Sequence, residues 1–105
     1  MAEYSRRHID YPKPFTAYAA ADCTITGTNW DVKSNSSLFD TINVGRHIYI
    51  ETNDDVIVRF NSMANDAVTM SGGDTLTLDN FNVQNVYVTT LAGSAFVKFF
   101  MFGWD

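Results

Sequence analysis

Short segments that alternate apolar and polar residues recur along this chain, and they constrain the fold more than any other feature. Val56, Val58 and Phe60 alternate with Ile57 and Arg59. Such a two-residue period places successive side chains on opposite faces of a β-strand. The same period recurs at residues 47–51, 67–70, 75–78 and 86–89. No stretch sustains a helical period, so the sequence predicts an all-β fold.

Turn-forming residues separate these segments. Asn and Asp cluster at residues 52–55 and 61–66, and glycines occur in Ser71–Asp74, where we expect a β-hairpin. Residues 38–40 are the one place where we expect a helical turn. Short strands at this spacing are typical of an antiparallel β-sandwich, either a jelly roll or an immunoglobulin-like fold. With 105 residues the chain has room for one domain, which we place at residues 15–105.

Residues 1–14 form a distinct opening segment. Pro12 and Pro14 disfavour a helix and bias the chain toward extended geometry. One interpretation is a frayed terminus. The other is an extended N-terminal arm that lies across a neighbouring subunit and is anchored by four large side chains, Tyr4, Ile9, Tyr11 and Phe15.

The last predicted strand is apolar on both faces. A half-solvated sheet normally keeps one face polar, but here the only charged residue is Lys98. In a domain this small we interpret the pattern as a subunit interface, because buried aromatic rings contribute strongly to association. The predicted interface residues of this strand are Phe96, Val97, Phe99, Phe100, Met101 and Phe102.

The composition bears on the kind of partner. Only 18% of the residues are charged, below the roughly 25% of typical proteins, which indicates apolar surface meant for a partner. The net charge of −5 argues against nucleic-acid binding, which needs clustered Lys and Arg. No apolar run approaches the roughly 20 residues of a membrane-spanning helix. We therefore expect a soluble protein with neither nucleic acid nor membrane as a partner.

No combination of residues indicates catalysis. Cys23 is the single cysteine, and no pattern places His8 or His47 beside it to ionise the thiol. We expect Cys23 to be a small buried hydrophobe on a strand. The Asp and Asn residues lack the spacing of a calcium loop, and one Cys with two distant His residues makes no zinc site. The sequence predicts no enzyme activity, no metal and no cofactor.

The C-terminal half resembles small virion structural proteins of tailed bacteriophages. The resemblance rests on short Val/Ile/Thr strands, Asn-Asp turns and a polar strand ahead of the final apolar one, at residues 56–62, 65–69 and 81–90. It implies a β-sandwich that forms a homo-oligomer and contacts other virion proteins, as a capsid decoration, head-tail or fibre component. It also implies a location in the virion after synthesis in the host cytoplasm.

Carbohydrate binding is the alternative function. Sandwich domains of lectin type stack sugars on exposed aromatic rings, and such a domain could be the receptor-reading part of a phage fibre. The candidate stacking residues are Tyr49, Tyr87 and Trp30. The competing interpretation assigns the tryptophan to a core or interface and the tyrosines to the sheet surface.

Overall fold

Strands make up most of the computed structural model, which describes residues 14–42 and 44–104. The strands in that part of the chain are β1 (Ala17–Thr26), β2 (Trp30–Asp31), β3 (Val44–Thr52), β4 (Val56–Phe60), β5 (Val68–Met70), β6 (Thr75–Val83), β7 (Val86–Thr90) and β8 (Ser94–Trp104). A single helical turn, α1 (Val32–Asn35), follows β2.

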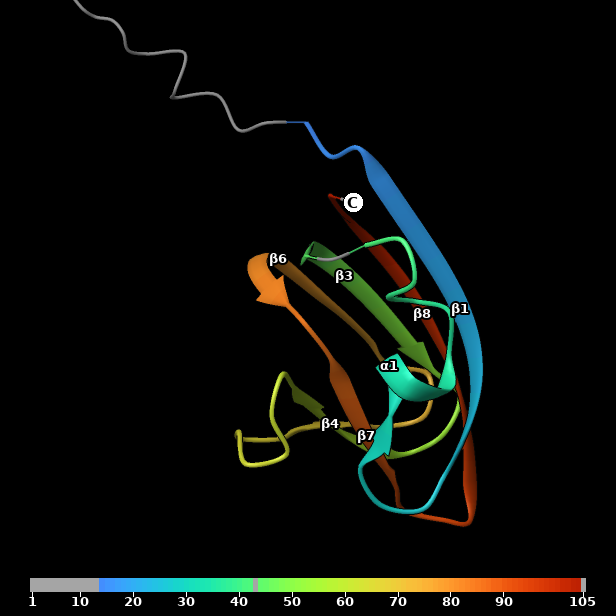
Figure 1. Ribbon diagram of the computed structural model, residues 1–105. Coiled ribbons are helices and arrows are strands. Elements are labelled where there is room, and N and C mark those ends of the chain that lie inside the picture. Colours follow the sequence, from blue (N-terminus) through green and yellow to red (C-terminus); the bar gives the residue numbers. More distant parts are fainter. Residues whose placement is uncertain (1–13, 43, 105) are drawn as a thin grey trace, which may run out of the picture.

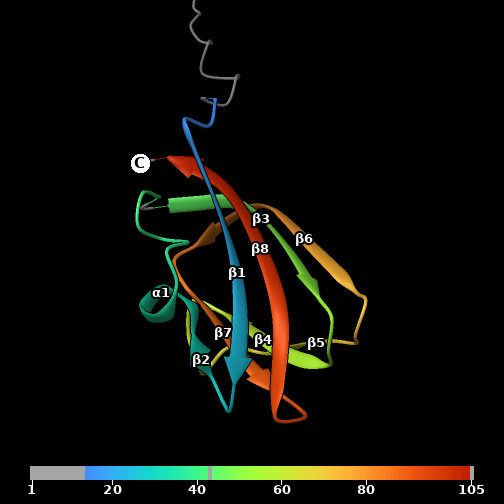
Figure 2. The same ribbon diagram turned by 90° about the vertical axis from the view of Figure 1, so that its right-hand side faces the viewer.

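The strands form two four-stranded sheets. The first sheet has the order β1-β8-β3-β6 and the second has the order β2-β7-β4-β5. Every pairing between neighbouring strands is antiparallel. Figure 1 shows the long strands of the first sheet curving past β4 and β7 of the second, and Figure 2 shows β8 between β1 and β3. The predicted all-β fold is confirmed.

Most connections cross from one sheet to the other. Of the strands described, β4 and β5 are the one consecutive pair that share a sheet. The hairpin expected at Ser71–Asp74 is therefore wrong, because β5 pairs with β4 whereas β6 pairs with β3. Gly73 does take a positive φ of 93°, so the turn was recognised correctly. Turn chemistry reverses the chain locally, but it does not decide which strands become neighbours.

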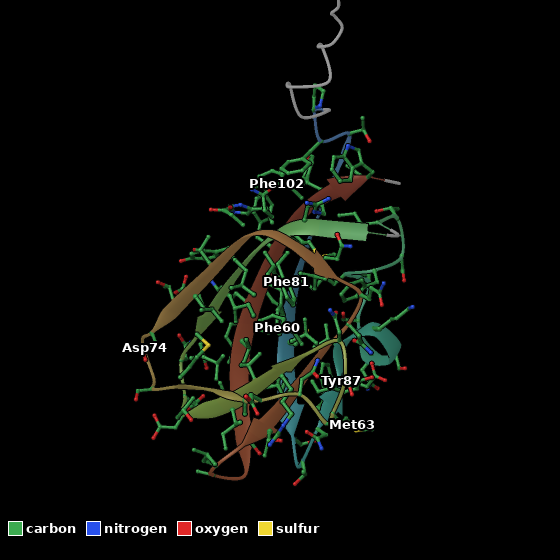
Figure 3. All side chains as sticks on the ribbon, turned by 90° about the vertical axis from the view of Figure 1, so that its left-hand side faces the viewer. Phe60, Met63, Asp74, Phe81, Tyr87 and Phe102 are labelled. Carbon is green, nitrogen blue, oxygen red and sulfur yellow. The ribbon has the colours of Figure 1, made fainter. Side chains whose placement is uncertain are left out.

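The inward faces of the two sheets enclose one hydrophobic core. β4 contributes Val56 and Val58, and β8 contributes Val97, Phe99 and Met101, all at most 1% exposed. Cys23 on β1 joins this core at 5% exposure, as the sequence predicts. At the β6 side, Phe81 lies edge-on to Phe60, with 6.0 Å between ring centroids (Figure 3).

Three carboxylates hold the turns that join the two sheets. Asp54 Oδ2 accepts a hydrogen bond from the backbone N–H of Phe96 at 3.2 Å. Asp55 Oδ1 accepts one from Gly72 at 2.8 Å, and Asp74 Oδ2 accepts one from Ser71 at 2.8 Å. These contacts explain why the turns are acidic, because each carboxylate accepts a hydrogen bond from a backbone N–H group. No cluster of three or more potential metal ligands occurs among the described residues.

The helix α1 lies at Val32–Asn35, whereas at residues 38–40, where we expected a helical turn, the chain forms a single turn in which the Asp40 N–H donates to Ser37 O at 3.1 Å. Asp31 is the N-cap, and its carboxylate accepts the Ser34 N–H at 3.2 Å. Asn85 Nδ2 donates to the same carboxylate at 2.8 Å. Leu38 is fully buried and packs into the core from the connection that follows α1. Its apolar character reflects burial and not helix formation.

Asp31 links this turn to β7 and carries a lowered pKa. Burial raises the pKa of the carboxyl, but the hydrogen bonds from Asn85 and Ser34 stabilise the ionised form and outweigh it. A carboxyl whose folded pKa lies below its unfolded value stabilises the fold above the unfolded pKa, which is about 3.9. That contribution disappears as the pH falls through the folded pKa.

We predict that Asp31→Ala lowers the free energy of unfolding by about 1 kcal/mol at neutral pH, the usual effect of losing an N-cap. The difference between the variant and the wild type shrinks below about pH 4, because protonation weakens the same contacts in the wild type. Urea unfolding at several pH values measures both effects. Asp40→Ala, at an exposed position, is the control and should change little. A difference that stays constant with pH would contradict the role of the charge.

Candidate functional site

β8 divides its side chains between the core and the outer face of the first sheet. Val97, Phe99 and Met101 point inward and are 0%, 1% and 0% exposed. Our assignment of these three residues to an oligomer interface is therefore corrected, because the domain's own second sheet covers them. The sequence pattern alone did not tell which apolar face would be covered by the same chain. The other face of β8 carries Phe96, Phe100 and Phe102, all half-buried.

Phe100 and Phe102 belong to a group of rings at one end of the outer face. The strand register sets Tyr18 of β1 beside Phe102, and Phe102 beside His47 of β3. Tyr18 is 70% exposed and Phe15 is 44% exposed, so the group is open to solvent. We call this surface the aromatic face; it consists of Phe15, Tyr18, His47, Phe100, Phe102 and Trp104.

The rings of the aromatic face pack against one another. Phe100 and Phe102 meet edge to face at 4.9 Å between centroids, and Tyr18 lies 5.9 Å from Phe100. Phe15 lies 6.2 Å from Phe102 in a stacked arrangement and 5.2 Å from Trp104. Such contacts contribute about 0.5–1.5 kcal/mol each beyond the area that they bury. They hold the rings in place while leaving the outer surface free.

Charged and polar groups surround these rings. The imidazole of His47, 5.4 Å from the ring of Phe102, contacts the carboxylate of Asp79 through Nδ1. The Arg46 guanidinium lies 5.6 Å from the centroid of the Trp104 ring, within cation–π range. One step along the sheet, the register aligns Lys98 between Asp22 and Glu51. The aromatic face is thus an apolar centre with a polar rim, the anatomy of many protein interfaces.

The three candidate sugar-stacking residues do not meet. Tyr49 lies beside Phe100 on the outer face of the first sheet, and its Oη donates to Glu51 at 3.3 Å. Burial and the nearby Glu51 carboxylate raise the pKa of this tyrosine. Tyr87 is on β7 of the second sheet, away from the end of the molecule that carries Phe102 (Figure 3). Trp30 on β2 packs against the core.

An open hollow of about 420 Å³ lies beside β1. One wall is formed by residues 20–24 of β1, and the other by Trp30 and residues 35–37. Cys23 borders it, but burial raises the pKa of the thiol despite a hydrogen bond with Ser36. The thiol therefore stays protonated at neutral pH and is a poor nucleophile.

Sequence reasoning missed the part of the aromatic face that β1 supplies. Residues 17–21, AYAAA, show no alternation of apolar and polar residues, and alanine has a low β-propensity, so the sequence predicts no strand there. The structure makes them the first half of a ten-residue strand. A single large aromatic residue, Tyr18, among alanines was the feature of the sequence that could have indicated this surface. The predicted anchors Tyr4, Ile9 and Tyr11 lie outside the described residues, so the arm remains a prediction. The fourth predicted anchor, Phe15, is corrected, because it packs on Phe102 and Trp104 of its own chain.

Comparisons with known proteins bear on the fold alone. No family model matches the chain, and no curated protein matches it. A solved structure described as a de novo designed double-stranded β-helix is similar in fold, with a TM-score of 0.51 and 10% sequence identity. The similarity covers 80% of this chain and 97% of the designed one. No helix of the described part is long and apolar enough to cross a membrane.

We predict that neighbouring residues of β8 respond differently to truncation. Phe99→Ala should lower the free energy of unfolding by about 3–5 kcal/mol, because it opens a cavity in the core. Phe100→Ala should cost less than half of that, because its ring is partly solvated in the folded state. Guanidinium unfolding of both variants measures the difference. Equal losses would show that the inner and outer faces are assigned wrongly.

Proposed function

We propose that this protein is a non-enzymatic structural protein that assembles through its aromatic face. The observation that carries the proposal is a group of mutually packed rings that stays open to solvent, with Tyr18 70% exposed. Clustered apolar surface with a polar rim commonly marks a protein–protein contact. Covering a half-exposed ring stabilises a complex by roughly 2 kcal/mol at ~25 cal/mol per Å². A few such rings supply much of the free energy of a specific association.

Within the all-β class, we propose that the fold is a jelly roll. Eight strands divided between two four-stranded sheets, with most connections crossing between them, support this type over an immunoglobulin-like sandwich. The similarity to a designed double-stranded β-helix points in the same direction. Jelly rolls serve as viral capsid domains, lectins and cupins, so the fold does not choose the function by itself.

The setting we propose is a bacteriophage particle, as the sequence resemblance implies. The partners are then other copies of this chain and other virion proteins, in a capsid decoration, head or tail component made in the host cytoplasm. The nine-residue and eleven-residue strands β3 and β8 build a rigid support for the aromatic face, which suits a structural role. Detection of the chain in purified particles by mass spectrometry tests this setting, and its absence from them would contradict it.

Glycan binding is the second candidate, favoured by Tyr49 beside the aromatic face and Trp30 beside the hollow. The geometry supports it less well. Phe100 and Phe102 are inclined by 79° to each other, whereas a sugar platform presents its rings flat to the ligand. Glycan-array binding that is lost in Tyr49→Ala or Trp30→Ala, and retained in Tyr87→Ala, would favour this candidate over assembly.

We predict that the wild type forms an oligomer and that Tyr18→Ser and Phe100→Ser weaken it at least tenfold, because each removes more than 1.4 kcal/mol of apolar burial. Size-exclusion chromatography with light scattering over a concentration series measures the association. Tyr87→Ser is the matched control, since it removes a half-buried ring from the outer face of the second sheet. A wild type that stays monomeric, or an equal effect of Tyr87→Ser, would contradict the proposal.

A further inference from the structure

The free edge of β1 differs from the other three sheet edges. β2 and β5 are only two and three residues long. β6 is continuous but irregular near Asn80, which has a φ of 56°, because its register with β3 shifts between Asp79 and Val83. Short strands and bulges are devices that prevent pairing with another chain. By contrast, β1 pairs with β8 in uninterrupted register over Ala17–Thr26, with no proline, lysine or bulge.

The hollow follows this free edge. Five consecutive residues of β1, Ala20–Thr24, line it. Because consecutive strand residues point to opposite faces, a cavity that touches all five runs along the backbone itself. Figure 2 shows α1 and β2 on the side of β1 away from β8. An edge strand presents unpaired N–H and C=O groups on that side, so the hollow offers them to an added strand.

The opposite wall limits what can enter. Trp30 and residues 35–37 face β1 across the hollow, so a complete second sheet would collide with α1. A single extended segment is the narrowest element that can pair with the edge of β1. Ala20 and Ala21 are small, which lets another backbone approach the strand closely. The geometry therefore favours addition of one strand, a common mode of peptide recognition.

We propose that residues 1–11 of a second copy of this chain add to the free edge of β1 and fill the hollow. The inference rests on the proposed assembly and names one of its contacts. The segment has no proline before Pro12, so its amides can donate to a strand ladder. It carries three large apolar side chains. Arg6 and Arg7 offer partners for the exposed Asp22 of β1, and Glu3 and Asp10 balance their charge within the segment.

The way in which the segment joins the domain favours a second copy over the same chain. The Pro14 carbonyl accepts a hydrogen bond from Trp104 Nε1–H at 2.9 Å. Thr16 N–H donates to Gly103 O at 3.1 Å, and Phe15 packs on two rings. Proline also holds the residue before it in extended geometry. These contacts fix the direction in which the chain enters β1. A reversal of the same chain onto its own free edge would have to turn at residues 12 and 13, and a proline on each side of Lys13 disfavours the tight turns that this needs.

Photo-crosslinking in the full chain tests where the segment lies. The variant Ser37→p-benzoylphenylalanine sets the probe on the rim of the hollow, and Thr69→p-benzoylphenylalanine on the edge strand β5 is the control. The protein is mixed from isotopically heavy and light copies before irradiation. We expect heavy–light crosslinks between residue 37 and residues 1–11, and none from residue 69. Crosslinks within one copy only, to another segment, or to no partner would overturn the proposal.

Two matched pairs of substitutions test the backbone ladder. Successive N–H groups of a strand point to opposite sides, so of Ser5 and Arg6 one donates to β1 and the other faces away. Ser5→Pro or Arg6→Pro should therefore weaken association about tenfold relative to Ser5→Ala or Arg6→Ala, which keep the N–H. If neither proline variant differs from its alanine control, strand addition is overturned. An oligomer that depends on Tyr18 and Phe100 but on neither proline substitution overturns only this inference, whereas a monomeric wild type overturns both.

Discussion

The pairing of β8 with β1 on one side and β3 on the other is the contact on which the rest of the structure depends. β8 matches β1 over all ten residues of that strand and matches β3 over most of its length. Its inward side chains, Val97, Phe99 and Met101, form the centre of the core. Its outward side chains, Phe100 and Phe102, form the centre of the aromatic face. The same strand therefore supplies side chains both to the core, which stabilises the domain, and to the surface that we propose for assembly.

The crossing connections explain why the turns are rich in Asp and Asn. A chain that passes from one sheet to the other leaves backbone N–H groups without ladder partners at each crossing. Asp55 and Asp74 accept hydrogen bonds from such groups in the turn between β5 and β6, and Asp54 accepts one from Phe96 of β8, beyond the end of β3. Asn85 has the same role where β7 meets α1, because its Oδ1 accepts a hydrogen bond from the Lys33 N–H at 3.0 Å. The acidity of the chain is, in this part of the molecule, a structural property.

Assembly through the aromatic face and strand addition at β1 would use adjacent parts of one sheet. Tyr18 projects from the outer face of β1, whereas the hollow follows the backbone edge of the same strand. Phe15 and Trp104 pack together where the chain enters β1. Residues 1–11, exchanged between copies, would therefore leave their own domain next to the aromatic face. Both proposals assign the association to the first sheet and leave the outer face of the second sheet free.

The sequence by itself determined the all-β class, the positions of most strands and the burial of Cys23, because period-two alternation and turn residues act over a few neighbouring positions. It also identified β8 as apolar on both faces. Only the tertiary structure decided that Val97, Phe99 and Met101 are core, that Ser71–Asp74 joins two sheets, and that the alanine-rich residues 17–21 form an edge strand. Strand pairing depends on contacts between residues distant in the chain, and these leave no local pattern to read.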